Sequence, residues 1–550
     1  MSDAFTSKVL IVGAGPVGLV AALALSLNGV KVRIIDKLPA PAVGQRGSTI
    51  APRTLEAYRL LGILPDVLKL ATPFPEIQDH SPDGTPGRRF SILPRLPPSP
   101  AVPYPNHLQL GQDYVAGILR EHLERRCGVN VEWGTECVGL EQDGDGVNVA
   151  IRKGETDGRL KVEYVIGADG AKSMVRKLTG FSFEGETAAD TRMLIGDVEL
   201  SGFEGESTDP AIRMFKDDDG NNIIIRPVPE RPGLCFIVSR GPLLDIPRAC
   251  ADHAYLLSHI RFLASREDIK MGAECTVTEW HLNVRMANTF QKGRIFIAGD
   301  AAHVHSPTGG QGLNSGVMDA MNLAWKLALV VRGAAIPSLL DTYSTERTPP
   351  IREMLNLTTT RTKHNFALKR TADAAAHPLA FRMLGVHCRG SDIVNDELVV
   401  DRRTEIEEVS AYGGEGEDTG RVHAGDRAPD APGLRDADGT ERSLFDLFDL
   451  AKHTVLVFDP ALVDELLGAV QTFEVECIQT LLVLEAGSAS CTSPRGVQVV
   501  VDFKGLASQA YSVAQGTRIA VVRPDGVVGG MLKGTKGVND YFARVLNSVA

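Results

Sequence analysis

A long glycine-rich stretch, residues 293–329, carries residue types that could hold an anionic ligand. It begins with a short apolar segment at 294–298 that is typical of a buried strand, continues through a loop at 303–312 with two adjacent glycines, and becomes an amphipathic helix from Asn314. Glycines let a ligand come close to the backbone. A helix that starts directly after them presents unpaired N–H groups and the positive end of its dipole. Such a terminus stabilises an anion by about 0.3–1 kcal/mol, or up to about 2 kcal/mol when partly buried.

A second glycine-rich turn lies close to the N-terminus, between a predicted strand at 8–12 and a predicted helix at 19–28. Its sequence, GAGPVG, places Gly13 at the tight turn, Gly15 where the backbone meets a pyrophosphate and Gly18 where the helix packs on the strand. The next predicted strand, 30–35, ends at Asp36, which is placed to accept a hydrogen bond from a ribose 2′-hydroxyl. This βαβ context predicts a dinucleotide site, and the acidic residue argues against a 2′-phosphorylated ligand. Lys37, directly after Asp36, is a further candidate ligand.

The two motifs together resemble those of FAD-dependent aromatic hydroxylases, the single-component flavoprotein monooxygenases of the phenol hydroxylase and 4-hydroxybenzoate hydroxylase type. The pattern that carries the resemblance is GDAAHxxxPxGGQGLN, from Gly299 to Asn314. The resemblance implies that Asp300 binds the ribityl chain of FAD and that a backbone segment faces the flavin pyrimidine ring. The residues of this segment are Gly312, Leu313 and Asn314, and Gly310 is a further candidate cofactor-binding residue. Pro307, in the same motif, is assigned to positioning the substrate or the flavin. The helix dipole then stabilises the anionic reduced flavin.

Further residues extend the resemblance. Arg46 would contact the FAD pyrophosphate, although an ordinary surface arginine is the alternative. Gln112, at the start of a predicted helix over 114–125, matches a flavin-side glutamine better than Gln109 does. Asp169 and Arg176, in a DG segment after the strand at 162–166, would serve FAD and a transient nicotinamide cofactor. For Asp169, a helix cap is the alternative.

The resemblance assigns fewer residues on the substrate side than on the cofactor side. Arg285 stands where phenol hydroxylase-like enzymes hold a pocket arginine, and it would pair with a phenolate or an acidic substrate group; a structural salt bridge is the alternative. The phenol hydroxylase branch carries an aspartate near position 47 or 48 that acts on the phenol. This chain has Gly47 and Ser48 there, so we assign no group that deprotonates a phenol.

The sequence predicts an α/β fold in several parts. A Rossmann-type FAD-binding domain is expected from residues 1–180 and 285–394, with a β-sheet substrate domain of short strands inserted at 181–284. The proline- and glycine-rich segment 73–105 is interpreted as an irregular excursion that belongs to the substrate side. Residues 395–424 are interpreted as a linker and 425–550 as a thioredoxin-like α/β domain. Because Cys477 and Cys491 form no CxxC pair, we expect this last domain to act in structure or dimerisation.

Composition excludes several other classes of function. The net charge of −11, from 69 acidic and 58 basic residues, argues against a nucleic-acid surface. No apolar run reaches the roughly 18 residues that a membrane span needs, and no signal peptide is evident, so a cytoplasmic protein is expected. The eight scattered cysteines suit a reducing compartment. His303 and His305 lack the further ligands of a zinc site, and the acidic turn at 143–146 lacks the frame of a calcium loop, so no metal is predicted.

The resemblance implies an enzyme that uses NADPH or NADH to reduce FAD and then forms a C4a-hydroperoxyflavin with O₂. A small phenolic or aromatic molecule would attack its distal oxygen, giving ortho-hydroxylation or decarboxylative hydroxylation; hydroxylation of a polycyclic polyketide fits the same motifs. A Baeyer–Villiger enzyme or another FAD oxidoreductase, acting on a polyketide-type substrate, is the alternative on the same fold. A non-catalytic flavin-binding scaffold is a third hypothesis. A homodimer is compatible with each of them.

Overall fold

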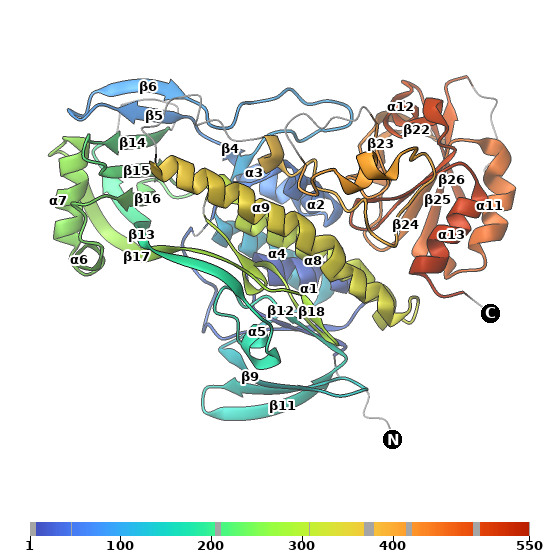
Figure 1. Ribbon diagram of the computed structural model, residues 1–550, viewed down its shortest axis with the longest axis horizontal. Helices are drawn as coiled ribbons and strands as arrows, with labels where there is room; N and C mark the ends of the chain where they lie inside the picture. The colour runs from blue at the N-terminus through green and yellow to red at the C-terminus, as the bar shows by residue number, and fades with distance from the viewer. Residues whose placement is uncertain are drawn as a thin grey trace.

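The computed structural model describes residues 7–45, 47–203, 211–306, 308–367, 379–413, 421–487 and 496–548, without the side chains of 188–191, 308 and 361–367. The molecule is elongated, with an eight-stranded sheet at one end, a second α/β unit at the other and a parallel α/β layer between them (Figure 1). Arg46, Pro307 and Cys491, which the sequence analysis singled out, lie outside the described residues.

The central layer is built on a sheet of parallel strands with one antiparallel edge strand, in the order β18-β19-β12-β1-β2-β8. Its strands are β1 (Val9–Val12), β2 (Val32–Asp36), β8 (Val131–Trp133), β12 (Tyr164–Gly167), β18 (Gln291–Lys292) and β19 (Ile295–Ile297). The strands at its centre are fully buried, as apolar runs without alternation predict. This confirms the Rossmann-type part of the predicted fold.

Helices cover this sheet and form the largest hydrophobic core of the molecule. The long helices α1 (Pro16–Leu27), α4 (Gln112–Cys127) and α8 (Gln311–Val331) pack side by side, and α9 (Asp341–Ala367) packs against α8 (Figure 1). Smaller elements complete the layer: α2 (Pro52–Leu60), α3 (Leu64–Leu70), α5 (Met174–Thr179), the 3₁₀ turns η1 (Gly299–Ala301), η2 (Thr308–Gly310), η3 (Pro337–Leu340) and η5 (Leu379–Arg382), and a small sheet of β3 (Thr49–Ile50), β7 (Leu108–Gln109) and β4 (Thr72–Pro73).

A separate antiparallel meander lies beside the central layer. It consists of β9 (Thr135–Gln142), β10 (Val147–Lys153) and β11 (Thr156–Val162). The turn between its first two strands is the predicted acidic hairpin, in which Asp143 accepts hydrogen bonds from the backbone N–H groups of Asp145 and Gly146, both at 2.9 Å. The acidic residues here therefore shape a turn.

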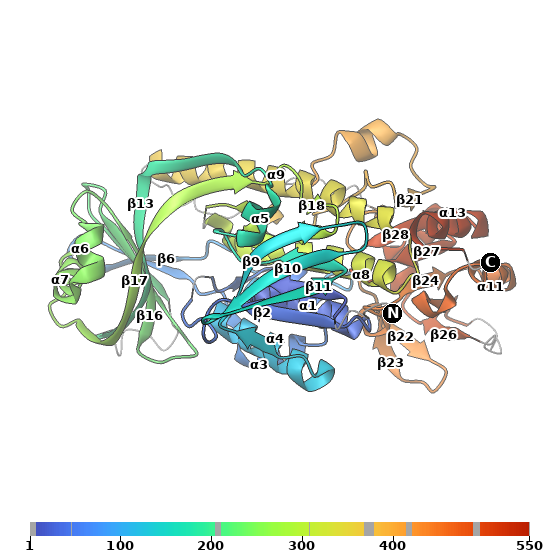
Figure 2. The ribbon, with the colours of Figure 1, turned by 90° about the horizontal axis from the view of Figure 1, so that it is seen from below.

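The eight-stranded sheet, called the substrate sheet below, has the order β20-β17-β13-β16-β15-β14-β5-β6. Its strands are β5 (Ile77–His80), β6 (Pro86–Phe90), β13 (Glu184–Ser201), β14 (Ile212–Lys216), β15 (Asn222–Pro227), β16 (Leu234–Arg240), β17 (Lys270–Met286) and β20 (His303–Val304). Two expectations are corrected. β13 and β17 are 18 and 17 residues long, not short, and they form a curved arm that reaches the central layer (Figure 2). The segment 73–105 is not wholly irregular, because β5 and β6 form the far edge of this sheet, on the predicted substrate side.

One face of the substrate sheet is covered by α6 (Ile246–Ala251) and α7 (His253–Ala264), which the sequence analysis did not predict. Leu194, Ile223, Ile225 and Ile237 point toward these helices and share a core with Leu256 of α7. Because side chains alternate along a strand, their neighbours point to the opposite face. We call this opposite face, with Ile195, Met214, Ile224, Phe236 and Val238, the open wall.

The C-terminal unit is a mixed sheet in the order β21-β28-β27-β24-β25-β26-β22-β23. Its elements are β21 (Asn395–Asp396), the π-helical turn η6 (Arg403–Glu407), β22 (Pro432–Asp436), β23 (Glu441–Ser443), α10 (Leu444–Leu447), β24 (His453–Val457), η7 (Pro460–Leu462), α11 (Val463–Val470), η8 (Val475–Cys477), β25 (Ile478–Glu485), β26 (Val497–Asp502), α12 (Leu506–Ala510), η9 (Val513–Gln515), β27 (Ile519–Val522), β28 (Val528–Leu532) and α13 (Thr535–Val545). β24 runs parallel to β25 and antiparallel to β27. The segment interpreted as a linker contributes β21, which pairs with β28. The thioredoxin-like assignment and the domain boundaries remain predictions.

Candidate functional site

The N-terminal turn uses its three glycines for three different reasons. Gly13 has φ +107°, and a Cβ on it would lie 2.3 Å from the Ala168 carbonyl oxygen. A Cβ on Gly18 would lie 1.9 Å from the Gly13 carbonyl oxygen. A Cβ on Gly15 would meet no atom within 4 Å, and helix α1 begins at this residue without a side-chain cap. The first two glycines are therefore required by the fold, whereas Gly15 leaves space in front of an uncapped helix terminus, where a phosphate is stabilised.

Asp36 lies at the end of β2, beside this turn. Its Oδ2 accepts a hydrogen bond from Ala14 N at 2.8 Å, and its Oδ1 accepts one from Leu38 N at 2.8 Å. The carboxylate is thereby fixed in place, and each oxygen retains a lone pair for a ribose hydroxyl. Lys37 is exposed next to it.

The DG segment lies against the same turn, since a Cβ on Gly13 would come within 2.8 Å of Asp169 Cα. Asp169 Oδ2 accepts hydrogen bonds from Met174 N at 2.6 Å and Val175 N at 3.2 Å, so the carboxylate stabilises the first turn of α5, close to the capping role considered as the alternative. The N-cap residue itself is Ser173. Its Oδ1 is buried and has no hydrogen-bond partner in the described part of the chain. Arg176 is buried and donates to Ala301 O and Ala171 O, each at 2.7 Å, so in this structure it ties α5 to the turn that carries Asp300.

The start of α8 lies across from these elements. Gly310 has φ +63°, and α8 begins at Gln311 without a side-chain cap. Gly312 and Leu313 are half-buried and Asp300 is exposed. The Asn314 side chain is fully buried instead: its Oδ1 accepts from Ala51 N at 2.8 Å, and its Nδ2 donates to Thr49 O at 2.9 Å and to Gly310 O at 2.7 Å. Only the backbone of Asn314 is therefore available to a ligand.

The loop at 44–48 meets the start of α4. Gln112 N donates to Gly47 O at 2.9 Å, and a Cβ on Gly47 would lie 3.5 Å from Gln112 Oε1. Gln112 is therefore brought to the loop that contains position 46. Gln109 is buried on β7, where its Nε2 donates to Pro227 O at 3.5 Å.

Arg285 lies on β17, in register with Val304 of the glycine-rich stretch. Its guanidinium donates to Asn283 Oδ1 at 3.0 Å, to Phe183 O at 3.3 Å and to Thr187 Oγ1 at 3.3 Å. Among the described residues it has no carboxylate partner, so the salt bridge considered as its alternative role is not found there. Its positive charge is half-buried and not neutralised by those residues.

A buried cluster beneath Asp300 escaped the sequence analysis. Asp319 of α8 accepts hydrogen bonds from Gly299 N at 3.1 Å and His303 Nε2 at 2.7 Å, and it forms an ion pair with Arg347 Nε at 2.8 Å. All three side chains are buried. Burial alone would raise the pKa of Asp319, but His303 and Arg347 outweigh it and lower this pKa to about 2. The readable signal was that Asp319 is the single acidic residue of α8.

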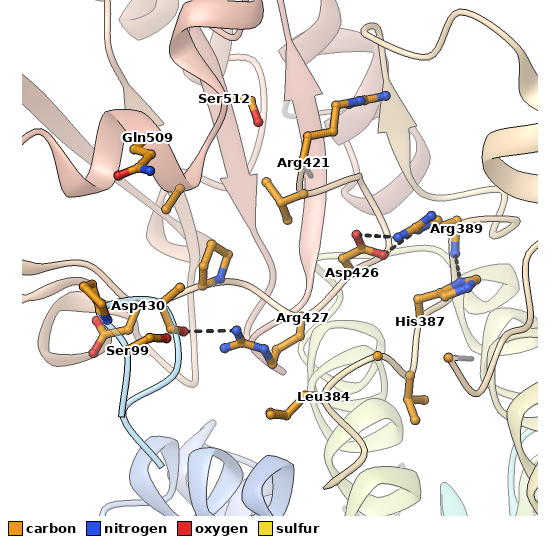
Figure 3. A pocket seen from close by; sticks show the side chains of 18 of the residues that line it. Ser99, Leu384, His387, Arg389, Arg421, Asp426, Arg427, Asp430, Gln509 and Ser512 are labelled. Carbon is orange, nitrogen blue, oxygen red and sulfur yellow. Dashed lines mark hydrogen bonds and ion pairs between the residues drawn. The ribbon is translucent and has the colours of Figure 1, made fainter. Parts of the chain in front are cut away.

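A cavity of about 560 Å³ lies elsewhere, between residues 99–101, 384–389, 421–430 and 506–512 (Figure 3). Its arginines have partners: Arg389 forms a two-pronged ion pair with Asp426, and Arg427 pairs with Glu56 Oε1 at 2.9 Å. None of the candidate cofactor residues that the structure describes lines it. Within the described ranges, no group of three or more His, Cys, Asp or Glu side chains is arranged to hold a metal ion, and no helix combines the length and apolarity of a membrane span.

Comparisons with known proteins show what these motifs belong to. The FAD binding domain family matches residues 6–358. A flavin-dependent monooxygenase of Mycobacteroides abscessus is 33% identical over 548 residues, which cover 98% of this chain and 100% of that protein. The chain belongs to this family of FAD-binding monooxygenases. Pentachlorophenol 4-monooxygenase of Sphingobium chlorophenolicum is a further relative, 34% identical over 64% of this chain and 63% of its own length.

Solved structures of flavin-dependent monooxygenases share the fold. The monooxygenase PieE, in complex with FAD and substrate, has a TM-score of 0.83 at 24% identity and covers 98% of this chain and 100% of its own. Aklavinone-11 hydroxylase, in complex with FAD and aklavinone, has a TM-score of 0.78 at 23% identity, with 99% of each chain covered. The family match and the Mycobacteroides abscessus relative confirm the resemblance stated from the sequence, the FAD cofactor and the class of enzyme.

The described residues of this FAD-binding monooxygenase fit the cofactor that its family binds. Two uncapped helix termini, at α1 and α8, and the space in front of Gly15 suit a pyrophosphate and the negative charge of a reduced flavin ring. Asp169 Oδ1, which has no hydrogen-bond partner among the described residues, and the exposed Asp300 add acceptors for hydroxyl groups. The individual assignments of Gly13, Gly15, Gly18, Asp36, Lys37, Gln112, Asp169, Arg176, Asp300, Gly310, Gly312, Leu313 and Asn314 to FAD remain predictions, as do those of Arg46 and Pro307.

Two alanine substitutions should separate the roles of the glycines. Gly15→Ala is expected to fold like the wild type and to bind FAD roughly tenfold more weakly, about 1.4 kcal/mol, because the new methyl group stands where the pyrophosphate approaches. Gly18→Ala is expected to lose both FAD and thermal stability, because its Cβ has no room. FAD titration and thermal unfolding of the two apoproteins measure the difference. A Gly15→Ala variant with wild-type affinity would contradict the assignment.

Proposed function

We propose that this enzyme uses NADPH or NADH together with O₂ to hydroxylate a small phenolic or aromatic molecule. The observation that carries the proposal is the open wall, an apolar sheet face on the substrate side of a fold that belongs to FAD-dependent monooxygenases. Hydroxylation or monooxygenation of aromatic compounds also appears in the names of its relatives, including pentachlorophenol 4-monooxygenase and 3-(3-hydroxy-phenyl)propionate/3-hydroxycinnamic acid hydroxylase.

The chain's own residues have definable tasks in such a reaction. FAD supplies the oxygen chemistry when bound. The N-terminus of α8 stabilises negative charge at the cofactor. The open wall orients a planar ring and excludes water, and the half-buried Arg285 offers a positive charge to a phenolate or an acidic substituent. A cytoplasmic location and a homodimer accompany the proposal as predictions.

The test is NADPH and NADH consumption by the purified yellow protein with oxygen, across a panel of phenols and hydroxybenzoates, with products identified by mass. Consumption stimulated by a phenol, with a product heavier by one oxygen atom, supports the proposal. A ketone converted to an ester would favour the Baeyer–Villiger alternative, which the comparisons do not favour over hydroxylation. Reduction without oxygen insertion would indicate another FAD oxidoreductase. Bound FAD without turnover on any class of compound would favour a flavin-binding scaffold.

A further inference from the structure

Two oppositely charged side chains interrupt the apolar open wall. Asp197 of β13 pairs in register with Phe236 of β16, and Phe236 pairs with Arg226 of β15, so the three residues form one row across the sheet. The Arg226 guanidinium carbon lies 5.0 Å from the centroid of the Phe236 ring. Both charged side chains are buried. Burial raises the pKa of Asp197 and lowers that of Arg226 to about 10, which shows that this environment disfavours both charges.

Gln45 joins the two charged groups. Gln45 N donates to Asp197 Oδ2 at 2.8 Å, and Arg226 Nη2 donates to Gln45 Oε1 at 2.8 Å. The preceding Gly44 has φ +103°, and a Cβ on it would lie 2.9 Å from Asp197 Oδ2. The wall therefore holds the turn at residues 44–45 through both the backbone and the side chain of one glutamine.

The chain that follows this turn leads to the start of α8. We call residues 47–51 the connector. Gly47 O accepts from Gln112 N on the α4 side, and both Thr49 O and Ala51 N bond to the Asn314 side chain, at 2.9 and 2.8 Å. A Cβ on Gly310 would lie 2.9 Å from Thr49 Cβ. The connector thus touches the helix terminus that is predicted to face the flavin.

The charged pair is not optimised for stability alone. Arg226 Nη1 and Asp197 Oδ1 are buried, and neither has a hydrogen-bond partner among the residues that the structure describes. Both atoms are sealed from solvent, so the pair acts on Gln45 and not on a ligand in this arrangement. Apolar side chains could pack the same space without unsatisfied polar atoms, and such exceptions are expected where function requires them.

We propose that Asp197 and Arg226 are positioning residues. Through Gln45 and the connector, they fix the position of the α8 N-terminus relative to the open wall. The alignment of the flavin edge with a ring on the wall would then depend on them. This consequence for catalysis rests on the proposed function. The coupling of Asp197 and Arg226 to the α8 N-terminus through Gln45 and the connector does not.

The first test compares Arg226→Met with the wild-type holoenzyme, using a phenol that the wild type hydroxylates. Because misplacement by about 1 Å can reduce a rate by roughly 100-fold, we expect the hydroxylation rate to fall roughly 10–100-fold. NAD(P)H oxidation should continue and yield hydrogen peroxide, with the KM for the nicotinamide cofactor nearly unchanged. Arg226→Lys should restore part of the product yield, because an ammonium group can still donate to Gln45 Oε1. Arg213→Met is the matched control: Arg213 is a half-buried arginine of neighbouring β14 that stacks on Phe203.

The second test does not depend on turnover. Amide hydrogen exchange of the apoprotein should become faster at 47–51 and at 310–314 in Arg226→Met, and should stay at wild-type rates in both segments in Arg213→Met. Gln45→Ala should reproduce this pattern, and combining it with Arg226→Met should add no further effect, because both variants break the same contact. If Arg226→Met does not fold, Gln45→Ala and Asp197→Asn carry the test.

The outcomes separate the two proposals. In one outcome, the wild type hydroxylates no compound although amide exchange at 310–314 becomes faster in Arg226→Met. That result would contradict the proposed function and support the coupling of the wall to the α8 N-terminus. Two results would overturn the proposed coupling of the wall to the α8 N-terminus. One is a wild-type exchange rate at 310–314 in Arg226→Met, and the other is a wild-type product yield from an Arg226→Met enzyme that has lost the contact to Gln45.

Discussion

Asp319→Ala is expected to destabilise the protein by about 3–5 kcal/mol, because it leaves the buried Arg347 guanidinium without its counter-charge. It also removes the acceptor that holds Gly299 N and His303 Nε2 beneath Asp300. We therefore expect the purified variant to contain little FAD. Denaturant unfolding of the apoprotein and the flavin content of the holoprotein measure the two effects separately.

Two comparisons make this result specific. Asp319→Asn keeps an oxygen that can accept from Gly299 N but loses the charge, so its stability should fall between those of Asp319→Ala and the wild type. Asp540→Asn removes an exposed carboxylate whose partner is Lys536 on α13, and it should leave both FAD content and unfolding unchanged. An Asp319→Ala protein that retains FAD with wild-type affinity would show that the cluster does not position the cofactor turn.

The same cluster predicts a pH dependence. The pKa of Asp319 falls from 3.8 to about 2 in the folded protein, so the folded state binds fewer protons at this site than the unfolded state. Its contribution to stability is therefore complete above pH 3.8 and is lost as the pH falls toward 2. The difference in unfolding free energy between the wild type and Asp319→Asn should stay constant near neutral pH and shrink below pH 4.

The sequence was sufficient to predict those parts of the fold that are determined by residues close together in the chain. The turn at Gly13–Gly18 follows from the φ angle and packing of single glycines, and the hairpin at Asp143 follows from an aspartate that bonds its own turn. The helix α7 could also have been read, since Asp252 caps it through Ala254 N and Tyr255 N. This capping signal is local and readable in the sequence.

Other features could not be predicted because they depend on residues far apart in the chain. Arg226 and Asp197 are unremarkable in sequence, and only the strand register and the approach of Gln45 bring them together. The extent of β13 and β17 depends on their pairing along a curved sheet. Asp169 shows a different limit, because the sequence predicted a helix cap and a cofactor contact as alternatives. One carboxylate oxygen bonds the first turn of α5, while the other has no hydrogen-bond partner among the described residues.

The interface between the C-terminal unit and the central layer gives the other large expected effect. Arg523, before the turn that joins β27 to β28, is fully buried and donates to Glu346 of α9 through Nη1 and Nη2, each at 2.9 Å. It also pairs with Asp525, whose carboxylate accepts from Trp325 Nε1 of α8 at 3.2 Å. Lys326 adds a further buried bond to Glu346 at 2.8 Å. The two positive and two negative charges balance, and they couple the C-terminal unit to the helix that begins at the cofactor site.

Arg523→Met should break this balance. Glu346 and Asp525 would remain buried with Lys326 as the one remaining cation of these four residues, and removal of one partner from a buried pair costs about 3–5 kcal/mol. Burial alone would raise the pKa of Glu346, but the two positive groups outweigh it and lower this pKa in the wild type. Losing one of them should raise the pKa again, so the unfolding free energy of the variant should fall less steeply with decreasing pH than that of the wild type. Thermal unfolding and limited proteolysis at the junction of the two units report the loss.

Conservative and surface variants decide whether the cluster holds the two units together. Arg523→Lys retains the charge but not the fork that bonds Glu346 and Asp525 together, so it should recover only part of the stability. Lys536→Ala removes an exposed ion pair from the same unit and should leave the melting temperature unchanged. If Arg523→Met lowers the stability of the C-terminal unit while α8 and α9 keep wild-type hydrogen exchange, the units are independent modules. If the amide exchange rate in Arg523→Met rises along α8 from Trp325 toward Asn314, the C-terminal unit supports the helix that begins at the cofactor site. The structural role of the C-terminal unit then follows from a buried charge network and not from cysteine chemistry.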